Sequence, residues 1–240
     1  MISLSREWAA LSRAMYGQEF IDELANLLRE NKVRTILECG CGDGHILRGL
    51  AEQGFVGVGI DTSLEMIALA LKNNQHFNIS YEQMNWLDIA DKIKAQFDAV
   101  MCRGNSLSAV SSWDNPAINP LEARKKIEES VGLFFERLKK GGLLYVDAVS
   151  QSEADRIGRV IEIKAEGVDL RGKIEYDLQN RTRRVFGEGK VLGEDFEGGS
   201  VSYLLMSDEL EGIVRKLNPS HVWRPKLEHE INYDLVCAVK

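Results

Sequence analysis

Three glycines at alternate positions, Gly40, Gly42 and Gly44, lie between an apolar run and a helical pattern. The apolar run, residues 33–37, is expected to form a strand, and the helix is expected to begin at His45. Because glycine has no Cβ, such a turn lets the backbone approach a ligand closely, and the free amides at the helix N-terminus face that ligand. The stretch therefore predicts the first turn of an α/β domain that binds a nucleotide-like ligand.

Two carboxylates accompany this turn. Glu38 stands two positions before Gly40, and Asp61 follows the next expected strand, residues 56–60. An acidic residue at that second position binds ribose hydroxyls in more than one family, so Asp61 alone does not identify the ligand. A dinucleotide-binding turn has the spacing G-x-G-x-x-G, whereas here it is G-x-G-x-G. The form E-x-G-x-G-x-G resembles motif I of class I S-adenosylmethionine-dependent methyltransferases.

Two later segments carry a more specific resemblance. MNWLDIADKI follows the third expected strand, residues 79–83, and FDAVMCRGNSLSAV contains the fourth, residues 97–102. Both are similar to the corresponding segments of the glycine N-methyltransferase and glycine/sarcosine N-methyltransferase group, and the similarity covers roughly residues 8–147. The resemblance implies an S-adenosylmethionine-dependent methyltransferase with a Rossmann-like α/β fold. That fold has a mostly parallel seven-stranded sheet with helices on both faces.

The resemblance also implies which residues bind the cofactor. These are Glu38, Gly40, Cys41, Gly42, Asp61, Thr62, Asn85, Trp86, Cys102 and Arg103. Asp61 would hold the ribose, and Asn85 and Trp86 would contact adenine. An N-terminal helix would close over the site with Trp8, Arg13 and Tyr16.

The acceptor side of the site is implied in the same way. Asn105 and Ser106 would face the transferred methyl group. Trp113 lies on a proline-bearing loop after the fourth strand, and such loops border the ligand crevice of α/β proteins. The expected substrate-binding residues are therefore Asn105, Ser106 and Trp113.

Two positions depart from the glycine N-methyltransferase pattern. That group carries a His and an Arg just after the Asp of the fifth strand, whereas here Ala148 and Val149 follow Asp147. Ala109 stands where the group has another His. Without these residues the site cannot bind a substrate carboxylate in the same bidentate way. The resemblance therefore does not imply that glycine is the substrate.

The choice of acceptor atom depends on whether a base is present. Methyl transfer from a sulfonium mainly requires alignment of the nucleophile and exclusion of water. A neutral amine needs no strong base, whereas a hydroxyl needs one within hydrogen-bond reach. The strand ends offer no His, and Asp147 is the candidate catalytic residue beside Asn105, with a structural or capping role as its alternative. The sequence favours methylation of a small-molecule amine, and O-methylation is the alternative.

Strands and helices alternate along the first two thirds of the chain, which predicts a parallel sheet covered on both faces. Two helices are expected over residues 4–30. Thr62 and Glu65 form the pattern of a capping box for the helix that follows strand 56–60 and runs through Lys72. A helix over residues 121–138 is expected to close at Gly141 and Gly142, before a fifth strand over residues 143–149.

Residues 159–206 are β-rich and predict an antiparallel insertion after strand five, with turns at 179–180 and 197–199. We expect residues 1–158 and 207–240 to form the cofactor-binding domain, and the insertion to be a lid, a substrate wall or a subunit contact. Arg181 and Arg183 of the insertion favour a solvated strand face. An acidic substrate is expected if they line the pocket.

Composition limits the partners. The net charge of −7 argues against nucleic acid, and no apolar run approaches the roughly 20 residues of a membrane span. The start of the chain has no signal-peptide pattern. The four cysteines have no zinc-ligand spacing and are expected to be buried thiols of a cytoplasmic protein. No metal site is expected, and a homo-oligomer is left open.

Three other functions are consistent with the glycine turn. A macromolecule methyltransferase is disfavoured by the acidic charge and by the lack of an N/D-P-P-Y/F signature after the fourth strand. A nicotinamide-dependent oxidoreductase and a non-catalytic cofactor-binding protein come from other classes. Binding of S-adenosylhomocysteine or of NAD separates the oxidoreductase from the rest, and a panel of amines and small metabolites scored for homocysteine release separates an enzyme from a silent binder.

Overall fold

The computed structural model describes residues 5–112, 118–150, 152, 159–230 and 232–240. Its main element is a seven-stranded sheet with the order β10-β11-β5-β4-β1-β2-β3. The strands are β1 Thr35–Cys39, β2 Val56–Asp61, β3 Ile79–Gln83, β4 Phe97–Cys102, β5 Leu138–Ala148, β10 His221–Trp223 and β11 Asp234–Val239. Strands β1 to β5 are parallel, and β11 is antiparallel to both of its neighbours.

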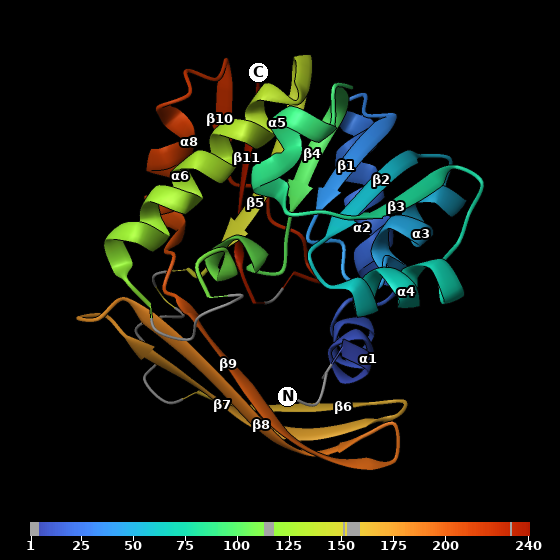
Figure 1. Cartoon of the computed structure of the whole chain (residues 1–240), viewed down its shortest axis with the longest axis vertical. Coiled ribbons are helices and arrows are strands. Elements are labelled where there is room, and N and C mark those ends of the chain that lie inside the picture. The colour runs from blue at the N-terminus through green and yellow to red at the C-terminus, as the bar shows by residue number, and fades with distance from the viewer. Residues whose placement is uncertain (1–4, 113–117, 151, 153–158, 231) are drawn as a thin grey trace.

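The strand order reverses next to β1. The chain proceeds from β1 to β2 and β3 on one side, and then returns to β4 and β5 on the other side of β1. In open α/β sheets such a switch point leaves a crevice at the carboxyl ends of the strands, where ligands bind. The loops after β1 to β4 therefore meet at one place, as Figure 1 shows.

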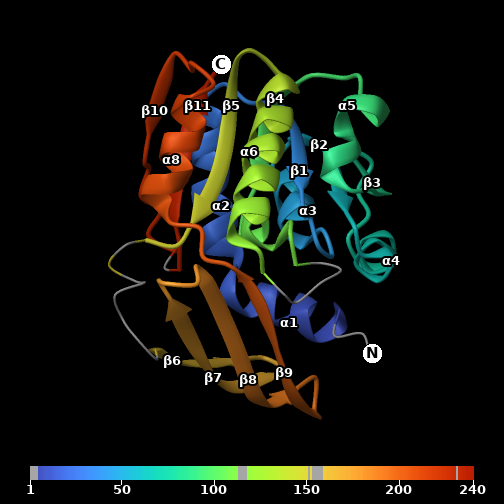
Figure 2. The ribbon, with the colours of Figure 1, turned by 60° about the vertical axis from the view of Figure 1, so that its left-hand side comes forward.

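Helices cover both faces of this sheet (Figure 2). The helices are α1 Ser5–Met15, α2 Gln18–Glu30, α3 His45–Glu52, α4 Leu64–Asn73, α5 Ile89–Lys92, α6 Pro120–Glu136 and α8 Ser207–Arg215, with short 3-10 turns η1 Trp86–Asp88 and η2 Ser106–Ala109. Adjacent residues of one strand enter different cores. Ile36 packs with the residues of α2 and α3, and Leu37 packs with those of α6 and α8. This two-sided burial accounts for the uninterrupted apolar strands.

A second, four-stranded antiparallel sheet follows β5. Its strands are β6 Arg159–Ala165, β7 Val168–Asp177, β8 Thr182–Val191 and β9 Glu194–Tyr203. In Figure 1 this sheet lies beyond the carboxyl ends of the parallel strands, with α1 between it and the main sheet. Leu11 of α1 packs in one buried cluster with Val168, Leu170, Val191 and Phe196. The insertion therefore stands over the edge of the sheet where a ligand is expected.

Three local predictions were wrong. Ser63, rather than Thr62, caps α4, because its side chain accepts a hydrogen bond from the amide of Met66. The fifth strand begins at Leu138, so Gly141 and Gly142 lie within β5 instead of closing a helix. A Cβ at Gly142 would lie 2.9 Å from the carbonyl oxygen of Lys139, so this stretch of the strand requires a glycine.

The third error concerns residues 197–199, which lie inside β9 and do not form a turn. The turn before β9 consists of Leu192 and Gly193, which both have positive φ. Glycine-rich sequence normally indicates a turn. At Gly199, however, a side chain would clash with the carbonyl oxygen of Val185 on the neighbouring strand. The expected turn at 179–180 lies between β7 and β8, as predicted.

The four cysteines are buried free thiols, as predicted. Among the described residues, no helix combines the length and the apolar character needed to cross a membrane.

Candidate functional site

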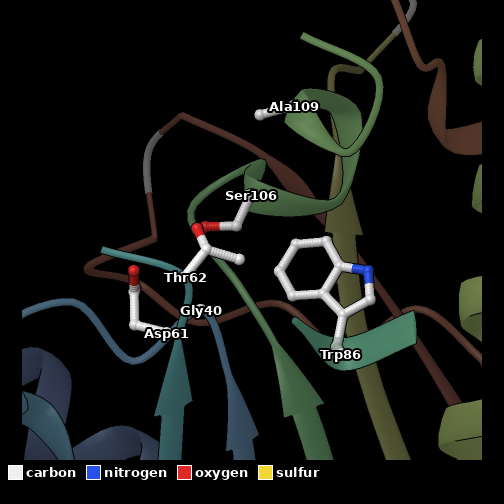
Figure 3. Close-up of a pocket in the computed structure, with 6 residues that line it drawn as sticks. All are labelled: Gly40, Asp61, Thr62, Trp86, Ser106 and Ala109. Carbon is white, nitrogen blue, oxygen red and sulfur yellow. The ribbon is translucent and has the colours of Figure 1, made fainter. Parts of the chain in front are cut away.

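A cavity of about 90 Å³ lies at the switch point of the sheet. It is lined by Gly40, Asp61, Thr62, Trp86, Ser106 and Ala109. These residues come from the ends of β1 and β2 and from the turns η1 and η2, which follow β3 and β4. Figure 3 shows the indole ring of Trp86 on one side of the cavity and the side chains of Asp61 and Thr62 on the other. Segments far apart in the sequence thus meet at the expected crevice.

The glycine turn is left-handed at each of its three glycines, with φ of 76° at Gly40, 56° at Gly42 and 75° at Gly44. A Cβ at Gly40 would lie 3.2 Å from the ring of Trp86 and 3.3 Å from the Cβ of Ser106. The backbone of the turn therefore comes close to the cavity wall only because no side chain stands there.

Asp61 occupies the end of β2 and lines the cavity. One carboxylate oxygen accepts the amide of Gly42 at 2.9 Å, and the other accepts the amide of Ser63 at 2.9 Å. Burial raises the pKa of Asp61, although these two amides act in the opposite direction. Each oxygen retains acceptor capacity, so the carboxylate is positioned to receive a pair of hydroxyl groups.

Trp86 is 2% exposed and is fixed on both sides. Its indole nitrogen donates to the hydroxyl of Ser130 at 3.0 Å, and its ring meets that of Phe134 edge to face at a centroid distance of 5.8 Å. One edge of the ring is left facing the cavity. Asn85, expected to contact adenine, has its side-chain oxygen 2.9 Å from the amide of Leu87, which it caps.

Glu38 and Arg103 form a buried ion pair, with Nε of Arg103 2.7 Å from Oε1 of Glu38. The guanidinium also lies over the rings of Tyr16 and Phe20, at 5.3 and 5.8 Å from their centroids. Burial raises the pKa of Glu38, and the charge of Arg103 opposes the shift. Arg103, expected alongside a cofactor, is thus held inside the protein by Glu38.

The N-terminal helix reaches the glycine turn through Arg13. Its guanidinium pairs with the carboxylate of Asp43, which also accepts from Nδ1 of His45 at 3.0 Å. Burial disfavours the charge on Asp43, but the hydrogen bond of His45 and the charge of Arg13 outweigh it and lower its pKa. Asp43 was missed by the sequence analysis, although its place inside the turn was a signal. Trp8 faces the insertion, where it packs with the cluster around Leu11.

The turn after β4 is anchored by Asp147. Its two carboxylate oxygens accept the amides of Gly104 at 2.6 Å and of Asn105 at 2.7 Å. Both donors have left-handed backbones, with φ of 67° and 59°. Burial raises the pKa of Asp147, and the two amides act against that shift. The carboxylate that was a candidate base is therefore already hydrogen-bonded on both oxygens, and it positions Ser106 at the cavity.

Near Asp147 lies a second group of polar residues, and the sequence analysis missed its carboxylate, Glu230. Glu230 is 9% exposed, and its Oε2 has no hydrogen-bond partner within the described chain. The same holds for the buried hydroxyls of Tyr16 and Tyr145. The local sequence around Glu230 carries no signal, because its position next to β5 follows only from the pairing of β11 with that strand.

The remaining expected residues are placed as follows. Cys41 and Cys102 are buried at the ends of β1 and β4, and Cys41 donates its amide to the carbonyl of Ile60 at 3.0 Å. Trp113 lies outside the described residues. Arg181 pairs with Glu209, and Arg183 donates to the hydroxyl of Tyr233 at 3.2 Å, so both bind within the protein instead of forming a solvated face. In the described part of the chain, no group of three His, Cys, Asp or Glu residues is placed to hold a metal ion.

Residues 36–120 match the family model described as methyltransferase domain. This match begins in β1 and covers the glycine turn, Asp61, Trp86 and the turn after β4. Residues 36–120 thus match a methyltransferase domain, and the sheet around them has the class I methyltransferase fold. S-adenosylmethionine is the cofactor of this class of enzyme, which agrees with the resemblance drawn from the glycine turn and the two later segments.

Two relatives and one solved structure describe what this methyltransferase domain is similar to. The glycine/sarcosine N-methyltransferase of Parasynechococcus marenigrum is 30% identical over 179 residues, 68% of this chain and 57% of that protein. The glycine N-methyltransferase of Oryctolagus cuniculus is 30% identical over 140 residues, 54% of this chain and 45% of that protein. The chain thus spans about half the length of these relatives.

Among solved structures, CalS10 from Micromonospora echinaspora, an amino pentose methyltransferase with S-adenosylmethionine bound, superposes with a TM-score of 0.75. It is 16% identical, and the match covers 97% of this chain and 96% of that one. At this identity the likeness shows the fold. It extends over the whole chain, including the antiparallel sheet, and so goes beyond the residues that the sequence relatives share.

Proposed function

We propose that this protein uses S-adenosylmethionine to methylate a small molecule at an amine nitrogen. The observation that carries the proposal is the cavity at the switch point, which brings Asp61, Trp86 and the open backbone of Gly40 together. A carboxylate suits the ribose hydroxyls, an indole edge suits adenine, and a glycine suits the close passage of the methionine part. The residues present therefore fit the cofactor.

The cofactor supplies an electrophilic methyl group when it is bound. The protein then has to orient the acceptor and exclude water. Asp147 serves the first task, because it holds the amides of Gly104 and Asn105 and so positions Ser106 at the cavity. The insertion and α1 serve the second, because they stand over the carboxyl ends of the parallel strands (Figure 1).

Two observations support a nitrogen acceptor. Both oxygens of Asp147 are occupied by backbone amides, so that residue is poorly placed to deprotonate a hydroxyl. Among the described residues that line the cavity there is no histidine. The relatives named glycine/sarcosine N-methyltransferase and the amino pentose methyltransferase also act on amines by their names, although this chain lacks the His and Arg of the glycine-specific pattern.

The net charge of the protein and the insertion that lies over the crevice both favour a small acceptor. A net charge of −7 disfavours nucleic acid as the substrate. A small molecule fits a crevice over which the insertion is folded. Cytoplasmic location remains a prediction from the sequence, as does the division into a cofactor-binding domain and an insertion, and a homo-oligomer is left open.

Calorimetric titration with S-adenosylhomocysteine and with NAD tests the cofactor. We expect S-adenosylhomocysteine to bind and NAD not to bind; the reverse result would favour the oxidoreductase. A panel of amino acids, amino sugars and alkylamines, with their hydroxyl counterparts, is then scored for homocysteine release. Methylation confined to hydroxyl compounds would overturn the nitrogen assignment, and binding without any turnover would favour a non-catalytic protein.

A further inference from the structure

A group of buried polar atoms lies next to the proposed methyl-transfer site and takes no part in the fold's hydrogen bonding. It consists of Oε2 of Glu230, the hydroxyls of Tyr16 and Tyr145, and Oδ1 of Asn105. Each of these atoms is buried and has no hydrogen-bond partner in the described chain. Buried polar atoms are nearly always paired in proteins, so an unpaired set calls for a ligand or another explanation.

The four residues come from distant parts of the chain but face the same few charged groups. Tyr145 precedes Asp147 by two residues on β5 and therefore shares its face of the sheet. Asn105 donates its amide to Asp147 at 2.7 Å, and Tyr16 stacks against Arg103 at 5.3 Å. The loop with Glu230 leads into β11, which pairs with β5 up to Ala148.

Every unpaired atom of this set can accept a hydrogen bond. A carboxylate oxygen and an amide oxygen are acceptors, and a tyrosine hydroxyl can accept as well as donate. An ammonium group has three N–H donors and no acceptor. A protonated primary amine is therefore the small group that best matches these atoms.

The balance of charge points the same way. Glu38, Asp147 and Glu230 are three carboxyl groups near one guanidinium, that of Arg103, and Arg103 is paired with Glu38 at 2.7 Å. Arg183 of β8 is directed to Tyr233, whose hydroxyl it reaches at 3.2 Å. Burial of carboxylates without a matching cation is costly. Without a ligand, Glu230 avoids this cost by keeping a proton, and a cationic amine would supply the positive charge that lets it ionise.

The environment of Glu230 also suits a proton acceptor. Burial, followed by the negative charge of Asp147, raises the pKa of Glu230, while the amide of Asn232 and the charge of Arg103 act against that rise. Tyr16, Tyr145 and Tyr233 complete the titratable groups around it. A carboxyl group with a raised pKa is a stronger base than an ordinary glutamate and is better matched to an ammonium group.

We infer that Glu230 binds the acceptor as a primary ammonium group, together with Tyr16 and Tyr145, and removes the proton that blocks its lone pair. This inference rests on the proposed function. The ammonium passes a proton to the Glu230 carboxylate and becomes a neutral amine. The amine lone pair forms the new N–C bond to the methyl carbon, and the C–S bond breaks with its electron pair on sulfur. The product is an N-methylammonium ion, and the proton on Glu230 leaves to solvent.

The site around Glu230 is connected to the cofactor cavity through Asp147. Asp147 holds Asn105, and the next residue, Ser106, lines the cofactor cavity and faces Gly40. The negative charge of Asp147 also acts on Glu230, so Glu230 lies near the same carboxylate. The proposed ammonium site and the cofactor cavity are thus joined through the single turn that Asp147 anchors.

The test compares wild type with Glu230→Gln and with the control Glu228→Gln, which changes an exposed carboxylate two residues away. The probe is the panel amine that the wild type methylates with the highest kcat/KM. We expect kcat/KM at pH 7 to fall by about 10²-fold or more in Glu230→Gln, the range of a general base. We also expect the wild-type rise of kcat/KM with pH to disappear. Glu228→Gln should behave as wild type.

A second readout does not depend on turnover. Binding of the amine to the S-adenosylhomocysteine complex is measured by calorimetry at pH 7 in buffers of different ionisation enthalpy. An ammonium group lowers the pKa of Glu230, so the wild type should release about one proton on binding, and Glu230→Gln should release none. S-adenosylhomocysteine should bind the variant with wild-type affinity, which also shows that the variant is folded.

Each of the following outcomes overturns the inference. Glu230→Gln could retain the wild-type kcat/KM and pH profile. It could also release as many protons as the wild type when the amine binds. It could instead lose affinity for S-adenosylhomocysteine while remaining folded, which would assign Glu230 to the cofactor's own amino group. If the wild type binds S-adenosylhomocysteine but methylates no amine, the nitrogen assignment and this inference fail together. If the wild type does not bind S-adenosylhomocysteine, the proposed function itself fails.

Discussion

Arg103 and Glu38 are 65 positions apart in the sequence, yet Nε of Arg103 lies 2.7 Å from Oε1 of Glu38 in the core of the protein. The pair joins the end of β4 to the end of β1, on the two sides of the switch point. It holds the first turn of the crevice against the turn that leads to Asn105 and Ser106.

Removal of one partner from this buried pair should be costly. Arg103→Ala leaves the carboxyl group of Glu38 buried without its cation, and we expect the free energy of unfolding to fall by about 3–5 kcal/mol. Urea denaturation measures the loss. Arg48→Ala, which breaks an exposed pair between Arg48 and Glu52, is the control and should cost less than about 1 kcal/mol. Equal losses in the two variants would contradict a special role for the buried pair.

Asp61 should determine cofactor affinity. Asp61→Ala removes the carboxylate that lines the cavity, and a hydrogen bond to a charged group contributes roughly 1.5–3 kcal/mol. We therefore expect calorimetry to show S-adenosylhomocysteine binding weakened by about 10-fold or more. Asp91→Ala, at an exposed position of α5, should leave the affinity unchanged. Wild-type affinity in a folded Asp61→Ala variant would place the ribose elsewhere.

Gly40 and Gly132 should respond in opposite ways to the same substitution. Gly40 has φ of 76°, and an added Cβ would meet Trp86 at 3.2 Å, so Gly40→Ala should lower both stability and S-adenosylhomocysteine affinity. Gly132 lies in α6, and a Cβ there would meet nothing within 4 Å. Gly132→Ala should raise stability by up to about 1 kcal/mol without affecting binding. Thermal melts with and without the ligand give both quantities, and a tolerated Gly40→Ala would contradict the close approach.

The stability of the protein should fall as the pH rises through the neutral range. Burial and the charge of Asp147 raise the pKa of Glu230 to about 8, compared with about 4.3 for an unfolded glutamate. Between these values the folded protein binds more protons than the unfolded chain, so the free energy of unfolding decreases with pH. The stabilisation that protonated Glu230 contributes is fully present below the pKa of the unfolded chain. It is lost as the pH rises to the pKa of the folded protein.

Urea denaturation between pH 5 and 8 checks this dependence against Glu230→Gln. The variant has no carboxyl group to titrate at this position, so its stability should fall less steeply than that of the wild type. Parallel curves for the two proteins would show that Glu230 has an ordinary pKa.

The sequence by itself determined the order of the elements, the fold class and one wall of the cavity. Those features depend on neighbours in the chain, because apolar runs bounded by glycines mark the strands. The structure adds that Gly40 and Gly42 have left-handed backbone, which favours glycine. Asp61 was identifiable because it ends the second strand, and Trp86 because its segment resembles that of the glycine N-methyltransferase group. The cap of α4 and the turn before β9 were mispredicted, because Ser63 competes with Thr62 and because Gly199 makes room for a neighbouring strand.

Only the tertiary structure decided which partner each polar residue has. Arg103, which the resemblance places alongside the cofactor, pairs with Glu38. Asp147, for which a base and a structural role were both open, anchors two backbone amides. Glu230 became a candidate only when β11 was seen beside β5. Periodicity reports whether a residue is buried, whereas the partner of a buried charge is set by strand order, which brings residues from distant segments together.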